Sequence, residues 1–164
     1  TICNQWAWKP NDKMKSLKEC LTILSKTAGG NGNLLLNVGP MPDGRMEARQ
    51  VKRLREIGAW LKVNGKAIYG TKGGPYEPTN VYATTRKNNI IYVHVLNPDT
   101  TAFTLKAIPG IRMVSAHTLT GEKVELVQNS GVIEIHKPQS EKNGLPYVVA
   151  LEADKPVESI PIIK

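Results

Sequence analysis

The sequence predicts an α/β segment followed by an all-β segment, and two changes of pattern along its 164 residues support this division. Residues 33–44, Asn-Leu-Leu-Leu-Asn-Val-Gly-Pro-Met-Pro-Asp-Gly, hold a continuous apolar run that ends in a turn, which is typical of a strand buried on both faces. After the Gly-Gly-Pro of residues 73–75, apolar residues alternate with a period of two, which indicates half-buried strands. We therefore expect one unit over residues 1–72 and a β-sandwich over residues 73–164.

The first unit is predicted to contain strand, helix, strand and helix in that order. Residues 1–5 end a strand, and Asn11-Asp12 caps a helix over residues 14–28, where apolar residues recur at helical spacing. Residues 34–38 form the buried strand, and the second helix runs over about residues 46–63. Two parallel strands with two helices can neither close a barrel nor form a stable open sheet, so we expect further strands upstream.

The second unit is predicted to contain seven short strands separated by turn residues, at the spacing of a sandwich. The predicted strands cover residues 81–85, 90–96, 103–107, 111–119, 124–127, 132–136 and 147–152. Ile91, Val93 and Val95 form one inward face, because every second side chain of a strand points to the same side. The tail at residues 156–164 packs as an edge or frays.

The net charge of +8 belongs to the first unit. Residues 1–72 hold 13 Lys or Arg against 5 Asp or Glu, whereas residues 73–164 hold 9 of each kind. Arg45, Arg49, Lys52 and Arg53 share one face of the second helix, which we interpret as a solvated exterior. A basic nucleic-acid binder is an alternative that predicts salt-dependent retention on polyanions, but no interleaved aromatic platform accompanies these charges, so we expect no nucleic-acid partner.

The sequence indicates no membrane segment, metal site or cofactor. No stretch approaches the roughly 20 apolar residues of a spanning helix. We interpret Cys3 and Cys20 as small buried apolar residues. The run Gly29-Gly30-Asn31-Gly32 precedes a strand instead of joining a strand to a helix, which excludes a phosphate loop. Three histidines without metal-ligand spacing are interpreted as ordinary sheet residues: His94, His117 and His136.

Three blocks of the first unit resemble the α-L-fucosidases of glycoside hydrolase family 29. Trp6-Ala7-Trp8 is similar to the family's Trp-Gly-Tyr segment, and residues 30–40, Gly-Asn-Gly-Asn-Leu-Leu-Leu-Asn-Val-Gly-Pro, form the second block together with Asp43-Gly44. The third block is residues 54–71, which begin Leu-Arg-Glu-Ile-Gly-Ala-Trp-Leu. The blocks occur in the family's order and at its spacing over about residues 1–75, and beyond Pro75 the resemblance is architectural.

The resemblance implies that the first unit is the last two βα units of a (β/α)8-type barrel, followed by an antiparallel β-sandwich. It implies a retaining exo-α-L-fucosidase that removes terminal α-L-fucose from a fucosylated glycan or oligosaccharide. The family's aspartate nucleophile and general acid/base lie upstream of the Trp6 block, so no catalytic residue is expected in this chain. The location implied is periplasmic or secreted in a bacterium and lysosomal in an animal.

The rival function is a non-catalytic carbohydrate-binding β-sandwich module. It needs exposed aromatic side chains on the sandwich, where four tyrosines, one phenylalanine and no tryptophan follow residue 72. Self-association through exposed barrel edges is a further expectation, because unpaired strand edges template pairing with another chain.

Two tryptophans are the predicted substrate-binding residues. In the family the aromatic at the position of Trp6 lines the fucose subsite, where an indole stacks on the apolar face of the sugar; the alternative is core packing. Trp8 either joins a leaving-group subsite or covers the barrel rim. Asn37 either orients a catalytic side chain or satisfies backbone groups of a loop, and we favour the second role.

Retention requires two carboxyl groups about 5 to 5.5 Å apart across the scissile bond. We expect structural roles for the five carboxylates of the first unit, as caps or turn residues (Asp12, Asp43 and Glu47) or on helix exteriors (Glu19 and Glu56). Asp43 is the strongest alternative candidate for chemistry, because its loop leaves a barrel strand at the catalytic face.

Overall fold

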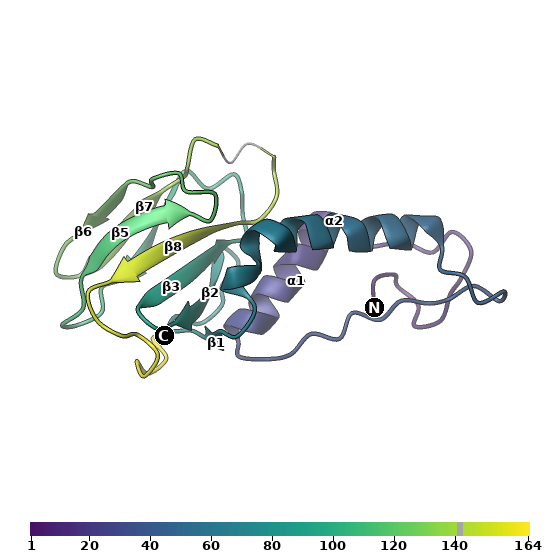
Figure 1. Ribbon diagram of the computed structural model, residues 1–164, viewed down its shortest axis with the longest axis horizontal. Helices are drawn as coiled ribbons and strands as arrows, with labels where there is room; N and C mark the ends of the chain where they lie inside the picture. Colours follow the sequence, from purple (N-terminus) through teal and green to yellow (C-terminus); the bar gives the residue numbers. More distant parts are fainter. Residues whose placement is uncertain (141–142) are drawn as a thin grey trace.

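Two antiparallel sheets and two long helices make up the computed structural model, which describes residues 1–140 and 143–164 (Figure 1). The helical elements are α1 (Leu17–Gly29), α2 (Ala48–Asn64) and the short 3₁₀ helix η1 (Gly65–Ala67). The strands are β1 (Lys72–Gly73), β2 (Tyr82–Lys87), β3 (Ile90–Val95), β4 (Ala102–Lys106), β5 (Met113–Thr118), β6 (Leu126–Gln128), β7 (Val132–His136) and β8 (Tyr147–Ala153).

The strands form the predicted β-sandwich. One sheet has the order β1-β2-β3-β8-β5 and the other the order β4-β7-β6, and every neighbouring pair is antiparallel. Their inner faces enclose the main hydrophobic core, in which Ile91, Val93 and Val95 are fully buried, as the alternation predicted. The seven predicted strands are confirmed within two residues at each end, whereas the two-residue β1 was not foreseen.

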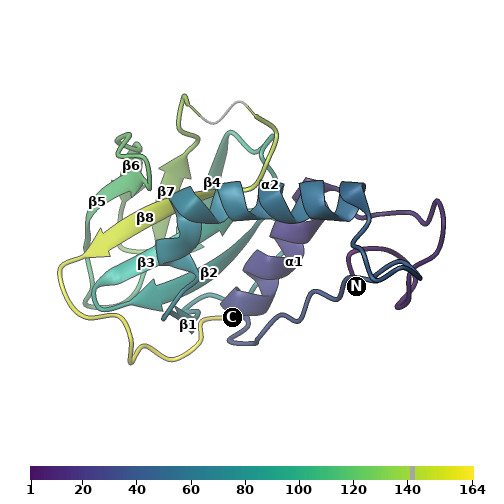
Figure 2. The same cartoon turned by 45° about the vertical axis from the view of Figure 1, so that its right-hand side comes forward.

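The helices lie against the outer face of the five-stranded sheet (Figure 2). The carboxyl end of α1 meets β2 closely, because a Cβ placed on Gly29 would lie 3.0 Å from the Cβ of Ala83. The carboxyl half of α2 is tied to the sandwich by Trp60, whose Nε1 donates to the carbonyl oxygen of Pro146 at 2.8 Å. Both helices therefore contact the sheet through their carboxyl ends, and the division into two domains at residue 72 stays a prediction.

The chain before α1 folds into a short antiparallel ladder instead of a single strand end. Residues 2–4 run beside residues 13–15, with Asn4 N donating to Lys13 O at 3.0 Å and Lys15 N to Ile2 O at 2.9 Å. The helix cap predicted at Asn11-Asp12 is therefore wrong. Asn11 instead adopts a left-handed conformation, with φ of 56°, inside the loop of residues 5–12 that joins the two sides of the ladder.

Helix α1 begins three residues later than predicted, behind a capping box. The N-cap is Ser16, whose hydroxyl accepts from Glu19 N at 3.1 Å, while the Glu19 carboxylate accepts from Ser16 N at 2.6 Å. These reciprocal bonds satisfy two amide groups that a helix start leaves without partners. They also lower the pKa of Glu19.

Replacing Ser16 by alanine is expected to lower the free energy of unfolding by about 1 kcal/mol, because it removes the cap. Chemical denaturation monitored by circular dichroism measures this change. Ser130, an exposed turn residue of the sandwich, is the matched control, and its replacement by alanine is expected to change stability by less than about 0.5 kcal/mol. Equal effects of the two substitutions would contradict the role of the capping box.

Residues 34–38, predicted as a strand buried on both faces, are extended but belong to neither sheet. Their link to the ladder is the bond from Ile2 N to Asn37 O at 2.8 Å, and the side chain of Leu35 is 75% exposed. A parallel strand is buried only when strands flank it and helices cover it. The described residues supply one backbone contact, so the predicted burial is not met in this chain.

Both cysteines are buried and unbridged, as predicted, and they pack in a small cluster with Ile2. Within the described ranges, no helix has the length and apolar content that crossing a membrane requires.

Candidate functional site

The loop of residues 5–12 carries the two tryptophans predicted to contact sugar. Trp6 is 69% exposed in this chain. Trp8 is half-buried, and its side chain lies near Glu47, the N-cap of α2. An exposed indole of this size is unusual unless a ligand or partner covers it, because burying an aromatic ring is strongly favourable.

Three contacts fix the path of this loop. Its ends are joined by Gln5 N, which donates to Asp12 Oδ2 at 2.7 Å. Its middle is held by Asn37, whose Nδ2 donates to the carbonyl oxygen of Trp6 at 2.8 Å. The amide of Asn37 thus satisfies loop backbone, which confirms the interpretation that we favoured.

The third contact joins backbone to backbone at Gly39. A Cβ placed on Gly39 would lie 2.5 Å from Trp8 N and 3.0 Å from Trp8 Cα, closer than any real side chain approaches. Only glycine fits at this position, and the segment after residues 34–38 therefore lies directly against the loop.

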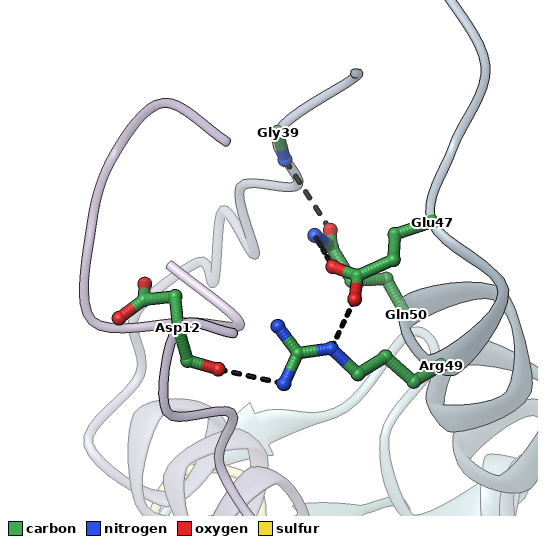
Figure 3. Close-up of polar contacts among 5 residues, drawn as sticks. All are labelled: Asp12, Gly39, Glu47, Arg49 and Gln50. Atoms are coloured by element: carbon green, nitrogen blue, oxygen red, sulfur yellow. Dashed lines mark hydrogen bonds and ion pairs between the residues drawn. The ribbon is translucent and has the colours of Figure 1, made fainter. Parts of the chain in front are cut away.

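A polar cluster at the start of α2 joins these segments (Figure 3). Its centre is Gln50, which is 2% exposed: its Oε1 accepts from Gly39 N at 3.3 Å and its Nε2 donates to Glu47 Oε2 at 3.4 Å. Arg49 pairs with Glu47 through Nε and donates from Nη1 to the Asp12 carbonyl oxygen at 2.7 Å. The hydrogen bond from Arg49 is the main cause that lowers the pKa of Glu47.

The cluster corrects the interpretation of the basic helix face as wholly solvated. Arg45 and Lys52 are exposed, as predicted. Arg49 and Arg53 are only partly exposed, because each donates a hydrogen bond to the backbone before α1, Arg49 to Asp12 O and Arg53 to Lys15 O. These arginines fasten the tryptophan loop and its ladder to α2.

The five carboxylates of the first unit have structural partners. Asp43 accepts from Arg45 N at 3.0 Å and from Arg45 Nε at 2.7 Å, and these bonds lower its pKa. It is a turn residue, since the N-cap of α2 is Glu47. Asp12 closes the tryptophan loop, and Glu56 pairs with Arg53 at 2.7 Å.

The histidines are placed in the sandwich, as predicted. His94 is fully buried, with its Nε2 3.1 Å from Thr85 Oγ1, and burial lowers its pKa to about 4. His136 lies 3.4 Å from Glu134 at the surface. Among the residues that the structure describes, no three His, Cys, Asp or Glu side chains gather as metal ligands would.

Gln50 and Arg49 are the site residues that sequence reasoning missed. Both occur in a polar stretch of α2 and follow the helical pattern of exposed positions. No local signal marks Gln50 as buried, because its burial depends on Gly39 and on the tryptophan loop, which are distant in sequence. The glycine in the apolar segment was the one available hint, since a glycine beside a strand often marks close backbone approach.

Comparisons of the chain with protein families and with curated proteins all give matches to alpha-L-fucosidases. A family model described as alpha-L-fucosidase matches residues 1–66. The chain is 36% identical over 141 residues to an alpha-L-fucosidase of Branchiostoma floridae, covering 79% of this chain and 30% of that protein. It is 32% identical over 131 residues to the plasma alpha-L-fucosidase of Homo sapiens, covering 73% and 28%.

The fold is also similar to that of a solved alpha-L-fucosidase GH29 from Bacteroides thetaiotaomicron, trapped as a covalent intermediate with 2-fluoro-fucosyl fluoride. The TM-score is 0.82 at 27% identity, and the match covers 93% of this chain and 36% of that one. The chain spans about 30% of the length of the curated relatives it matches, in their carboxy-terminal part.

Proposed function

Because the chain belongs to the α-L-fucosidase family, we propose that it is the carboxy-terminal part of a retaining exo-α-L-fucosidase that removes terminal α-L-fucose from glycans. In this proposal, residues 1–72 complete the catalytic (β/α)8-type barrel and residues 73–164 form a supporting β-sandwich. The nucleophile and the general acid/base come from upstream of Trp6, and this chain supplies one wall of the sugar pocket.

The exposed indole of Trp6 is the observation that carries this proposal. A large aromatic ring on a loop fixed by Asn37, Asp12 and Gly39 offers a pre-positioned apolar surface. Such a surface suits the C–H face and methyl group of fucose, and it loses little conformational entropy when the sugar binds. We propose that Trp6 contacts fucose and that Trp8, beside it, contacts the leaving group.

The retaining mechanism draws support from the trapped bacterial relative. A retaining glycosidase forms a covalent glycosyl-enzyme intermediate, and a covalent intermediate is what was trapped in that protein. The structural roles of the carboxylates in residues 1–72 support an upstream origin of both catalytic groups.

The chain alone is expected to show no hydrolysis of an aryl α-L-fucoside, because in this proposal both catalytic groups come from upstream of Trp6. The protein extended upstream is expected to hydrolyse the same substrate with retention of configuration, which proton NMR of the first-formed sugar measures. Turnover by the isolated chain, or inversion by the extended protein, would overturn this proposal. Hydrolysis of a different sugar by the extended protein would overturn the choice of substrate.

We further propose that the isolated chain self-associates through residues 34–38, where Leu35 is exposed and the extended backbone belongs to neither sheet. Light scattering that shows a monomer would contradict this. For the full-length protein we propose a periplasmic or secreted location in a bacterium and a lysosomal one in an animal.

A further inference from the structure

A groove between η1 and the β2–β3 turn combines an exposed aromatic ring with two unpaired ammonium groups. We propose that this groove binds an acidic pyranose, a sugar unit that carries a carboxylate or a sulfate group. It has a volume of about 400 Å³, within the range of roughly 300 to 1,000 Å³ that small-ligand sites occupy. Its lining includes Tyr69, Tyr92, Lys66, Lys87 and Asn88.

Tyr69 is the apolar platform of this groove. Its side chain is 62% exposed, and it shares with Trp6 the distinction of being an exposed aromatic among the described residues. The ring packs over Gly65, where a Cβ would lie 2.9 Å from Tyr69 Cε2, and the backbone of the two residues is joined by the bond from Tyr69 N to Gly65 O at 2.8 Å. An exposed ring that packs over a glycine leaves its other face free to stack on the C–H face of a pyranose.

Two lysines give the groove its positive charge. Lys66 and Lys87 are exposed, and a Cβ placed on Gly70 would lie 3.4 Å from Lys87 Nζ, so this ammonium group lies next to the residue that follows Tyr69. In the part of the chain that the structure describes, neither lysine has a carboxylate within ion-pair distance. One residue of the groove lining, Asn88, does contact a carboxylate: its backbone N donates to Glu158 Oε1 at 2.9 Å.

The ring of Tyr69 and the two ammonium groups together favour a sugar that carries a negative charge. Ammonium groups form charge-assisted hydrogen bonds with carboxylate or sulfate oxygens, whereas the ring contacts the sugar itself. A neutral sugar uses only the ring, and an inorganic anion uses only the lysines. A nucleic acid needs a longer basic surface than two lysines provide. The groove is also distant from the tryptophan loop, because it lies at the carboxyl end of α2 and the 17 residues of this helix span about 25 Å (Figure 1).

This proposal does not depend on fucoside hydrolysis, so its test measures the binding of sugars and not enzymatic activity. The full-length protein is titrated calorimetrically at low salt with a galacturonate trisaccharide, with 6-O-sulfated lactose and with neutral galactotriose. We expect at least one acidic probe to bind about tenfold more tightly than galactotriose, and the probe that binds identifies the anionic group. The affinity falls as salt rises, because exposed charges are screened.

Variants separate the ring from the charges. Tyr69→Ala is expected to raise the Kd of the acidic probe about tenfold, whereas Tyr69→Phe keeps the affinity. The double variant Lys66→Gln with Lys87→Gln removes the preference for acidic over neutral sugar. Lys52→Gln with Lys62→Gln, two exposed lysines of α2 outside the groove, is the matched control and leaves binding unchanged.

Three results would each overturn the proposal: equal binding of galactotriose and the acidic probes, full affinity in Tyr69→Ala, or equal losses in the two double-lysine variants. The last result would show adsorption to the basic surface as a whole. Thermal unfolding of each variant is measured first, so that a change in affinity is compared only among folded proteins.

Discussion

Replacing Trp6 by alanine in the full-length protein is expected to lower kcat/KM for an aryl α-L-fucoside about 100-fold, equivalent to ~2.7 kcal/mol of transition-state stabilisation. The substitution removes a ring that is 69% exposed and is carried by a loop that Asn37 holds. We expect this ring to contact the sugar. Substitution of a central aromatic anchor commonly has effects of this size. Steady-state kinetics with the purified protein measures the change.

The matched variants for this prediction are Trp6→Tyr and Tyr69→Ala. Trp6→Tyr keeps an aromatic face and is expected to retain most of the activity. Tyr69→Ala removes a ring of similar exposure, 62%, at the other end of α2 and is expected to leave hydrolysis of this neutral substrate unchanged. Wild-type kinetics in Trp6→Ala, with the fold intact, would exclude Trp6 from the sugar pocket.

Acidification from pH 6.5 to about 4 is expected to lower the free energy of unfolding by about 3 kcal/mol through His94 alone. Burial lowers the pKa of this imidazole to about 4 in the folded protein, from an ordinary value of 6.5. Below pH 6.5 the unfolded chain therefore binds a proton that the folded protein does not, and this favours unfolding. The loss of stability begins as the pH falls below 6.5 and is complete once the pH is below the folded value of about 4.

Urea denaturation at a series of pH values tests this linkage. His94→Gln keeps a polar group near Thr85 but does not ionise, so the slope between pH 6.5 and 4.5 is expected to flatten, even though the variant is less stable throughout. Ser130→Ala, which removes no ionisable group, is the control and should keep the slope. Carboxylates with lowered pKa values, such as Asp43, contribute mainly below this window. An unchanged slope in His94→Gln would contradict the assignment.

Local periodicity predicted the sandwich well because each strand carries its own signal. The inward side chains of β3 alternate with those on the other face, and turn residues separate the strands, so pairing partners need not be known. The segment at residues 34–38 behaved differently. Its apolar run predicts a buried strand, but burial depends on neighbours that the described residues do not supply.

The start of α1 and the polar cluster show two further limits of sequence reasoning. The Ser16-x-x-Glu19 pattern is a local capping signal, and the chain offered it alongside the competing Asn11-Asp12 pair. The helix begins after Ser16 because residues 13–15 are extended and pair with residues 2–4, and the sequence does not show this pairing. Similarly, the location of the tryptophan loop followed from a family pattern, whereas the burial of Gln50 depends on tertiary contacts alone.

The contact at Gly39 holds the backbone of the tryptophan loop without involving the side chains of that loop. Gly39 touches main-chain atoms of Ala7 and Trp8, and the side chains of Ala7 and Lys9 are exposed. Both positions can therefore vary in chemistry on an unchanged scaffold, provided that the glycine is kept. If the proposed role of Trp6 holds, a randomised library at residues 7 and 9 is the direct way to vary the surface that surrounds the bound sugar.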